Sequence, residues 1–277
     1  MSQDAAGPIL LVGAGRMGSA LLKGWLAQGI EPGRIFVQEP SLGGEATALI
    51  RDAGIATGSP PALPAAPAVL LLAVKPQAMD GVLPSLAALT GPDTLVISIA
   101  AGTTIANIAR HFGPDTAIIR AMPNTPAAIG RGITALYANG RVRPDQREAC
   151  AALLGAVGET VWIGEEALMD AVTALSGSGP AYVFLLAECM AKAGEAAGLA
   201  PDLAARLARA TVSGAGELLH TADLDPAELR RNVTSPGGTT AAALSVLMSE
   251  GPSGPLEALL REAVAAAARR SHELAGG

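Results

Sequence analysis

The sequence contains few aromatic and few charged residues. Its 277 residues include only three Phe, two Tyr and two Trp, and charged residues make up 16% of the chain. Hydrophobic residues account for 50%, so the core must be built from Ala, Val, Leu and Ile. That composition suits buried parallel strands and closely packed helices. The length is sufficient for two domains of ordinary size.

Other absences exclude whole classes of protein. The two cysteines, Cys150 and Cys189, fit no metal-binding or redox spacing, so no metal site is expected. The net charge is −6 and there is no basic stripe, which argues against a nucleic-acid partner. No apolar run approaches the roughly 20 residues of a membrane span, and residues 1–8 lack a signal-peptide pattern. These features predict a soluble cytoplasmic protein that binds neither nucleic acid nor membrane.

Short apolar runs alternate with helical patterns in the first part of the chain. Strands are expected at residues 8–13, 34–38, 68–74, 94–99, 116–120, 133–138 and 160–163. Helices are expected between them, near residues 17–28, 42–53, 77–89, 103–111 and 144–156. This alternation predicts a mainly parallel, doubly wound sheet.

The strand pattern stops near residue 164. Helical periodicity follows at residues 165–176, 180–197, 201–219, 226–232, 239–250 and 255–274. The sequence therefore predicts an α/β protein with an N-terminal sheet domain, residues 1–165, and a C-terminal all-helical domain, residues 166–277.

A glycine-rich turn joins the first predicted strand to the first predicted helix. It reads GAGRMG, the dinucleotide fingerprint in the strand–turn–helix context that gives it meaning. In such a turn the first glycine permits the bend, the second lets a pyrophosphate approach, and the third lets the helix pack on the strand. We therefore predict a Rossmann-like domain, although an ordinary glycine-rich turn is the alternative. The predicted cofactor-binding residues are Gly13, Ala14, Gly15, Arg16, Met17 and Gly18.

Glu39 ends the second predicted strand, about 20 residues beyond the last glycine of the fingerprint. An acid at this place typically binds the adenosine ribose hydroxyls of NAD and repels the 2′-phosphate of NADP. Ser41 can donate to such a phosphate and Arg16 can reach one. These residues favour NADH and leave NADPH open. The alternative is that Glu39 is a solvated loop acid.

Later strand ends are also expected to border the cofactor, because ligands of open parallel sheets bind beyond the carboxyl ends of the strands. Lys75 can contact a ribose or phosphate oxygen, and Asn124, set between prolines, can form a rigid polar wall near the nicotinamide. The alternatives are a surface lysine that starts a helix and a plain proline turn. The residues predicted to bind cofactor here are Ala73, Val74, Lys75, Ala100, Ala101 and Asn124.

Two glycine-rich segments begin helices in the second part of the chain. In SGSGPAY, Ser178 or Gly179 suits the cap and Pro180 the first helical position, and Ser178 and Pro180 are predicted to contact the cofactor. In VTSPGGTT, residues 233–240, the amides of the last glycine and both threonines open a helix without internal partners. Such a start is a ready site for a small anion, and an elaborate turn with an N-cap is the alternative.

The order of these motifs resembles that of the pyrroline-5-carboxylate reductase family. GAGRMG, AVKPQ, SIAAG, RAMPNTPA, LSGSGPAY and NVTSPGGTT all occur in the order which that family shows, over nearly the whole chain. Two positions depart from the family pattern. Arg16 stands where many members carry Asn, and Glu39 stands where NADPH-preferring members often carry a small or neutral residue.

The resemblance implies hydride transfer from NADPH or NADH to the ring imine of 1-pyrroline-5-carboxylate, the last step of proline synthesis. It also implies that the helical domain is a dimerisation domain, which makes the chain at least a homodimer, often assembled further as a decamer of five dimers. The family's active site lies between the sheet domain and the helical domains of the dimer. Thr240 is then catalytic and reaches the ring nitrogen. The implied substrate-binding residues are Ser235, Gly237, Gly238, Thr239 and Thr240.

Three alternatives share parts of this architecture: another imine reductase, a 3-hydroxyacid reductase and a non-catalytic dinucleotide sensor. Hydroxyacid enzymes place a catalytic Lys about one turn into the helix after the second glycine motif. The corresponding stretch here, PAYVFLLAE, has neither Lys nor His, and the first lysine after the motif is Lys192. Alcohol oxidation needs a base, so this class is disfavoured. A sensor has no use for a carboxylate site at Thr239 and Thr240.

Overall fold

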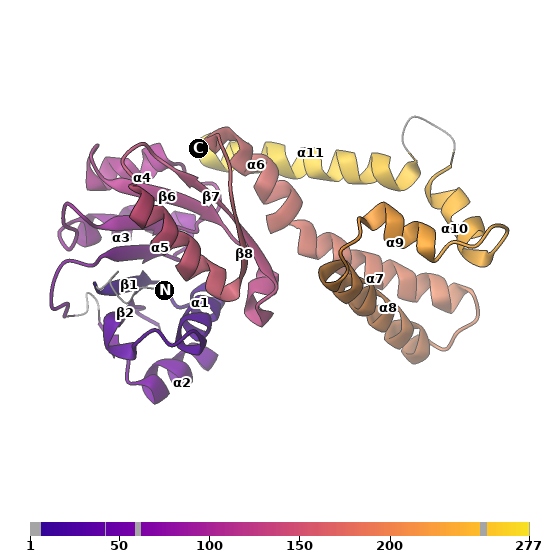
Figure 1. Ribbon diagram of the computed structural model, residues 1–277, viewed down its shortest axis with the longest axis horizontal. Coiled ribbons are helices and arrows are strands. Elements are labelled where there is room, and N and C mark those ends of the chain that lie inside the picture. Colours follow the sequence, from indigo (N-terminus) through magenta and orange to yellow (C-terminus); the bar gives the residue numbers. More distant parts are fainter. Residues whose placement is uncertain (1–6, 42, 59–61, 250–253, 277) are drawn as a thin grey trace. The chain divides into compact units, whose positions relative to one another are not determined.

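The computed structural model describes residues 7–41, 43–58, 62–249 and 254–276 (Figure 1). The chain forms two compact units. One, called here the sheet unit, runs to Gly177 and also includes the chain from Ala268 onward. The other, the helical unit, is Ser178–Ala267. Residues 1–6 lie outside the described residues, as do Leu42 and Glu250, where two predicted helices were expected to begin and to end.

These compact units divide the chain at other positions than the predicted boundary after residue 165. Residues 166–177 group with the sheet because Glu166 and Asp170 hydrogen-bond to residues of that unit. The division into residues 1–165 and 166–277 stays a prediction about domains.

The sheet unit is built on an eight-stranded sheet of order β3-β2-β1-β4-β5-β6-β7-β8. All neighbouring strands are parallel except β6 and β7. The order reverses between β1 and β4, which is the topological switch point of a doubly wound sheet. The predicted fold class is confirmed. The strands are β1 (Ile9–Val12), β2 (Ile35–Gln38), β3 (Ala56–Thr57), β4 (Val69–Leu72), β5 (Leu95–Ser98), β6 (Ala117–Met122), β7 (Gly132–Ala138) and β8 (Gly158–Trp162). The two-residue β3 is too short to give a sequence pattern.

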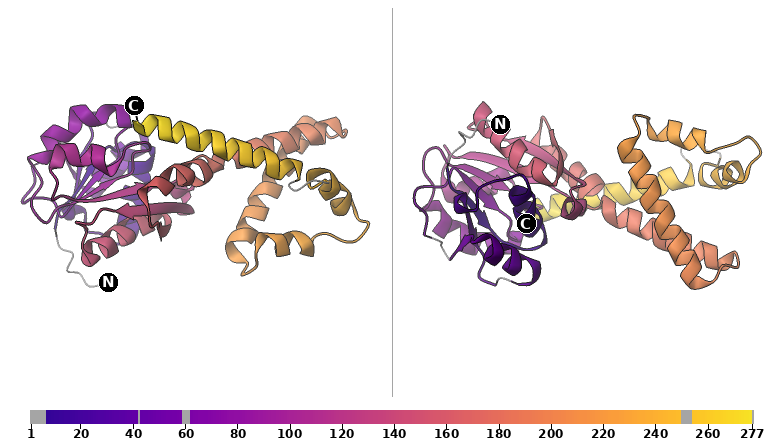
Figure 2. Two further views of the ribbon diagram at one scale, coloured as in Figure 1. Left: turned by 90° about the horizontal axis from the view of Figure 1, so that it is seen from above. Right: turned by 60° about the horizontal axis from the view of Figure 1, so that its bottom comes forward.

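Helices cover both faces of this sheet, as the two views of Figure 2 show. Ile9 and Leu11 of β1 belong to one apolar cluster, and Leu10 and Val12 belong to another on the opposite face. Because both faces are buried, the strands are continuous apolar runs rather than alternating ones. The helices of this unit are α1 (Arg16–Ala27), α2 (Gly44–Ala53), α3 (Met79–Ala87), α4 (Ile105–Phe112), α5 (Pro144–Leu154) and α6 (Met169–Val172).

Contacts between α1 and the end of α5 fix the helix that follows the fingerprint. Trp25 is fully buried, and its indole Nε1 donates to the carbonyl oxygen of Leu153 at 2.8 Å. A Cβ at Gly24 would lie only 2.7 Å from the carbonyl oxygen of Ala156. The absence of a side chain at Gly24 therefore allows α1 to approach this backbone closely.

The segment after β8 is not the single helix that was predicted for residues 165–176. It forms a 3₁₀ turn at Glu166–Leu168, the short α6, and a π-helical turn at Thr173–Gly177. Side chains of this segment form hydrogen bonds with distant parts of the chain. Glu166 accepts from the Ile105 amide, and the Ser176 hydroxyl accepts from the side-chain amide of Asn124. These contacts outweigh the propensity for regular helix.

The helical unit is dominated by α7 and α8, which pack against each other (Figure 1). A Cβ at Gly194 would lie 3.2 Å from Cβ of Ala204, so small residues let the two helices approach closely. None of the helices in the described part of the chain is long and apolar enough to cross a membrane. The helices are α7 (Gly179–Ala196), α8 (Pro201–Thr221), α9 (Pro226–Asn232), α10 (Thr239–Leu247) and α11 (Pro255–Gly276), whose last residues belong to the sheet unit.

Candidate active site

The fingerprint turn lies at the carboxyl end of β1, beside the end of β4. Gly13 has φ +98°, and a Cβ there would lie 2.6 Å from the carbonyl oxygen of Ala73, so only glycine fits. A Cβ at Gly18 would overlap the carbonyl oxygen of Gly13, which reflects close packing of α1 on the strand. Gly15 caps α1 without a side-chain hydrogen bond, and a Cβ there would meet nothing within 4 Å. The protein's own packing therefore does not demand Gly15, whereas a bound pyrophosphate would.

Glu39 is held against this turn by two backbone amides. Its Oε2 accepts from the Ala14 amide at 3.0 Å, and its Oε1 accepts from the Ser41 amide at 3.0 Å. The carboxylate is thus a positioned group and not a freely solvated loop acid. Each of its oxygens keeps a lone pair with which it can accept a ribose hydroxyl.

Two exposed cations stand near this edge. Arg16 occupies the first position of α1, and Lys75 follows β4. Neither has an ion-pair partner among the residues that the structure describes, so both charges are available to a phosphate. Val74 lies between Ala73 and Lys75 in the same segment and packs against the apolar cluster beneath it.

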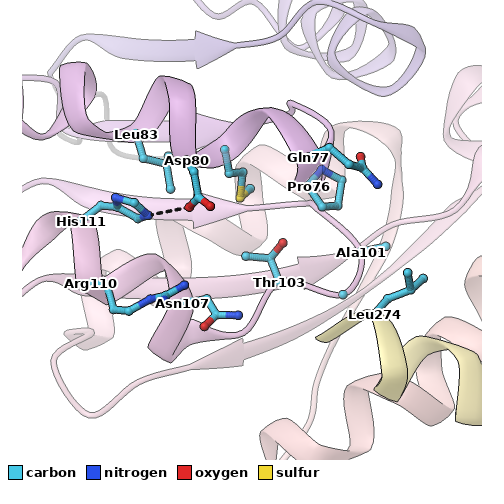
Figure 3. A pocket seen from close by; sticks show the side chains of 12 residues that line it. Pro76, Gln77, Asp80, Leu83, Ala101, Thr103, Asn107, Arg110, His111 and Leu274 are labelled. Atoms are coloured by element: carbon cyan, nitrogen blue, oxygen red, sulfur yellow. Dashed lines mark hydrogen bonds and ion pairs between the residues drawn. The ribbon is translucent and has the colours of Figure 1, made fainter. Parts of the chain in front are cut away.

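The segment after β5 forms a second tight turn at the same edge of the sheet. The Ser98 hydroxyl accepts a hydrogen bond from the Ala100 amide at 3.3 Å. Ala100 is buried, Ala101 is exposed, and Gly102 has φ +72°. A cavity of ≈ 320 Å³ opens between this segment and the one after β4, with Leu274 of α11 in its wall (Figure 3).

Asn124 follows β6, and its side chain is already engaged in the protein. Its Oδ1 accepts from the Ile133 amide at 3.0 Å, and its Nδ2 lies 3.3 Å from the Ser176 hydroxyl. This side chain therefore joins the proline-rich turn to β7 and to the π-helical turn. Its predicted contact with the cofactor stays a prediction, since a structural role accounts for both of its polar atoms.

The glycine-rich segment before α10 has the geometry of an anion site, with one correction. Gly237 has φ +70°, which favours glycine, and α10 begins at Thr239 with Gly238 as a cap that has no side-chain bond. The Gly238 amide is not open as expected, because it donates to the carbonyl oxygen of Ser235 at 3.0 Å. The amides of Thr239 and Thr240 belong to the first turn of α10, where backbone amides have no partner within the helix.

The other glycine-rich segment starts α7 in a slightly different way from that predicted. Ser178 occupies the cap position, but its side chain makes no capping bond, and Gly179 is the first helical residue. Pro180 follows it in the first turn, where the missing amide hydrogen costs nothing.

In the part of the chain that the structure describes, no strong acid–base pair or activated nucleophile accompanies these groups. Cys150 is buried, and burial raises the pKa of its thiol to about 12, so it stays protonated near neutral pH. Among the described residues, no group of three or more His, Cys, Asp or Glu is placed to hold a metal ion. The edge of the sheet unit, taken by itself, has a glycine turn and a positioned carboxylate that suit a dinucleotide. An open parallel sheet with this fingerprint and this acid defines the class of dinucleotide-dependent oxidoreductases.

Comparison with known proteins narrows this class. The family model for pyrroline-5-carboxylate reductase dimerisation matches residues 166–274, and the model described as NADP oxidoreductase, coenzyme F420-dependent, matches residues 8–102. A pyrroline-5-carboxylate reductase of Pseudomonas aeruginosa is 44% identical over 269 residues, which is 96% of each chain. One of Synechocystis is 52% identical over 206 residues, which is 74% of each chain.

Solved structures give the same result. A pyrroline-5-carboxylate reductase from Coxiella burnetii matches with a TM-score of 0.88 at 37% identity, covering 97% of this chain and 98% of that one. The Plasmodium falciparum enzyme, solved with NADP bound, matches with a TM-score of 0.78 at 27% identity over 98% and 99% of the two chains. The chain therefore belongs to the pyrroline-5-carboxylate reductase family. It is an oxidoreductase of proline biosynthesis that acts on a cyclic imine.

Proposed function

We propose that this chain reduces 1-pyrroline-5-carboxylate to L-proline with NADPH or NADH, and that Thr240 is its catalytic residue. The observation that carries this assignment is the start of α10, where two threonine amides and two hydroxyls stand together behind Gly237 and Gly238. A helix start of this kind binds a carboxylate, and the substrate carries one beside its imine.

The residues at the sheet edge fit a dinucleotide. The open space at Gly15 accepts the pyrophosphate, Arg16 and Lys75 offer positive charge, and Glu39 accepts ribose hydroxyls. Ser41, Ala100 and Ala101 complete the edge in this proposal. The cofactor supplies the hydride when it is bound.

The α10 start orients the substrate. In this proposal the amides of Thr239 and Thr240 bind the carboxylate, and the Ser235 hydroxyl adds a further donor. The Thr240 hydroxyl holds the ring nitrogen and stabilises the product amine. Threonine is far too weak an acid to protonate the imine, so the imine either binds already protonated, as the iminium, or takes its proton from water in the site. The rate then depends mainly on orientation, which can supply several kcal/mol.

The proposal includes the assembly and the compartment of the enzyme. It works as a homodimer at least, with a decamer of five dimers as the larger assembly, and it is cytoplasmic. Support for the dimer comes from the match of residues 166–274 to the family's dimerisation model and from the apolar surface of the helical unit.

Replacing Thr240 by Ala tests the assignment. We expect kcat/KM for pyrroline-5-carboxylate to fall at least about tenfold, or roughly 1.4 kcal/mol of transition-state stabilisation. The Kd of the cofactor should change little, because Thr240 does not belong to the sheet edge. Steady-state rates, followed by the loss of reduced-nicotinamide absorbance, measure the first quantity, and nucleotide titration measures the second.

Thr240→Ser is the matched control for this experiment. It keeps the hydroxyl and the helix start, so it should recover most of the activity lost in Thr240→Ala. Full activity of the alanine variant would remove Thr240 from the catalytic role. A wild-type chain that binds either cofactor but does not turn over the imine would overturn the function itself.

A further inference from the structure

The turn between β5 and α4 is supported from outside by residues far away in the sequence. Its own polar contacts are few: Ser98 accepts the Ala100 amide, and the Thr104 hydroxyl accepts the Asn107 amide at 3.2 Å as the cap of α4. Ala100 and Ala101 lie between these two contacts and belong to the proposed cofactor edge. The residues that support this turn therefore also fix the position of Ala100 and Ala101.

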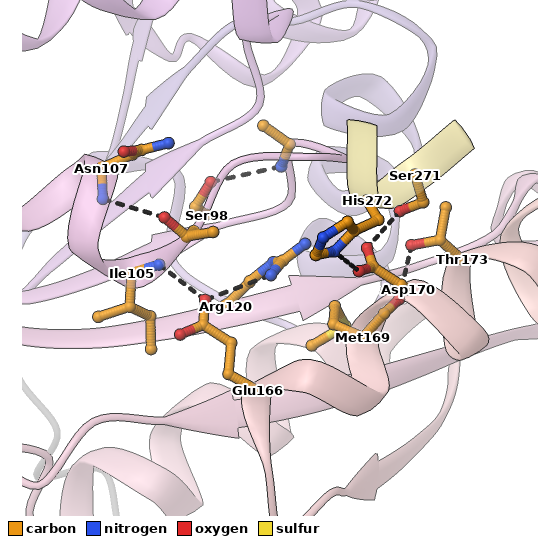
Figure 4. Close-up of polar contacts among 12 residues, drawn as sticks. Ser98, Ile105, Asn107, Arg120, Glu166, Met169, Asp170, Thr173, Ser271 and His272 are labelled. Atoms are coloured by element: carbon orange, nitrogen blue, oxygen red, sulfur yellow. Dashed lines mark hydrogen bonds and ion pairs between the residues drawn. The ribbon is translucent and has the colours of Figure 1, made fainter. Parts of the chain in front are cut away.

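Glu166 holds the start of α4. Its Oε1 accepts from the Ile105 amide at 2.8 Å and from Nη1 of Arg120 at 3.2 Å (Figure 4). The Ile105 amide is one of the helix-start amides that have no partner within the helix, and a carboxylate there also interacts favourably with the helix dipole. Glu166 therefore fixes the point at which the turn becomes α4.

Loss of the ion pair between Glu166 and Arg120 would be costly, because Arg120 is buried. It lies on β6 and is only 3% exposed, and its Nη2 is buried without a hydrogen-bond partner among the residues that the structure describes. Glu166 is the carboxylate that balances its charge. The Arg120 side chain is buried, whereas that of Glu166 is 28% exposed. Removing the carboxylate would leave the buried guanidinium without its counter-charge, so the pair favours one position of Glu166.

The last turns of α11 support the same turn from another side. Ser271, which is 4% exposed, donates its hydroxyl hydrogen to Oδ1 of Asp170 at 2.6 Å, and His272 Nδ1 lies 3.2 Å from Oδ2 (Figure 4). This docks α11 so that Leu274 lies against Gly102: a Cβ at Gly102 would be 3.2 Å from Cβ of Leu274. Figure 3 shows Leu274 close to Ala101 in the wall of the cavity.

We propose that Glu166 is a positioning residue for cofactor binding, and that the end of α11, through Ser271 and Leu274, completes the support of the turn. This inference rests on the proposed function, because it assumes that Ala100 and Ala101 contact the cofactor. Neither Glu166 nor Ser271 needs to touch the cofactor. They act through the backbone of residues 100–105.

The main test is Glu166→Ala, compared with Glu166→Gln in the full-length enzyme. The alanine variant should raise the Kd of NADPH about tenfold, the loss expected for hydrogen bonds to a charged group. The KM for pyrroline-5-carboxylate should change less than about twofold, because the start of α10 is untouched. Glutamine keeps an oxygen acceptor for Ile105 but removes the charge that balances Arg120, so its Kd should lie between those of the wild type and of the alanine variant. Glu165→Ala is the matched control: it removes an exposed neighbouring carboxylate and should leave the Kd unchanged.

A second variant keeps the inference testable if Glu166→Ala fails to fold. Ser271→Ala removes one hydrogen bond at the docked end of α11, and it should raise the Kd of NADPH by about twofold to fivefold. Glu273→Ala, which removes an exposed carboxylate from the same turn of the helix, should not. An unchanged Kd in folded Ser271→Ala, together with an unchanged Kd in Glu166→Ala if that variant folds, would overturn the inference.

Gly15→Val separates this inference from the proposed function. A side chain there would fill the space kept for the pyrophosphate, so NADPH binding should be lost. If Gly15→Val abolishes binding and the support variants do not, the cofactor edge stands and the positioning role fails. If Gly15→Val binds NADPH normally, the proposed cofactor edge is itself wrong.

Discussion

At the scale of single residues, Glu39 is the acid that we propose to set cofactor specificity. Its carboxylate is fixed by the amides of Ala14 and Ser41, so it cannot easily turn away from a bound adenosine ribose. A 2′-phosphate at this place would meet a fixed negative charge, whereas ribose hydroxyls would meet an acceptor. In the proposed site the charges of Arg16 and Lys75 would partly offset this repulsion, which leaves NADPH open as a cofactor beside NADH.

Glu39→Gln should therefore shift the preference toward NADPH. We expect the ratio of kcat/KM with NADPH to that with NADH to rise about tenfold, or roughly 1.4 kcal/mol. Steady-state rates with both cofactors measure this ratio. Glu31→Gln makes the same chemical change before β2, at the opposite end of the strand, and should leave the ratio unchanged. An unaltered ratio in Glu39→Gln would mean that the carboxylate does not face the ribose.

At the scale of elements, the position of the fingerprint depends on the packing of α1 against α5. Trp25 buries its whole side chain, and its indole N–H, the only hydrogen-bond donor of the side chain, donates to the Leu153 carbonyl. That carbonyl belongs to the last turn of α5, whose carbonyls lack partners within the helix. One indole thus supports two helices through packing and a hydrogen bond.

Trp25→Phe should lower the free energy of unfolding by about 1–3 kcal/mol, because it keeps most of the apolar surface but leaves the Leu153 carbonyl buried without a partner. Urea unfolding followed by circular dichroism at one fixed protein concentration measures the change. The other tryptophan provides a control: Trp162 is only partly buried and stacks with Arg147 at 3.7 Å. Trp162→Phe should cost less than about 1 kcal/mol. Equal losses in the two variants would contradict the role of the indole hydrogen bond.

At the scale of the whole molecule, the helical unit has almost no core of its own. Within the described part of Ser178–Ala267, the only buried hydrophobic residues are Ala204 and Ala208. Large apolar side chains are instead exposed to solvent, among them Phe184 at 67% and Leu259 at 65%. Exposed apolar surface on this scale marks an association site.

We therefore expect the apparent stability of the protein to rise with protein concentration, as it does when folding is coupled to association. Sedimentation analysis should show a dimer or a multiple of it. Phe184→Glu should weaken the assembly and lower the melting temperature, whereas Phe184→Leu keeps an apolar side chain and should preserve both. A monomer with the same melting temperature at all concentrations would refute the coupling.

Local patterns were sufficient to predict the α/β sheet, the order of most elements and the segments at its carboxyl edge. Continuous apolar strands, the glycine fingerprint and the glycine-rich starts of α7 and α10 are properties of short stretches, so each can be recognised without knowing its neighbours. The broken helix at residues 166–177 could not be predicted in this way, because contacts with distant residues determine it.

Tertiary structure alone decided which partner each polar group finds. The charge of Arg120 within an apolar strand was a signal that a carboxylate partner is needed, but not that Glu166 would supply it. In the same way, the side chain of Asn124 is used by Ile133 and Ser176. A sequence pattern specifies which groups can bond. Only the folded chain brings their distant partners within hydrogen-bonding distance.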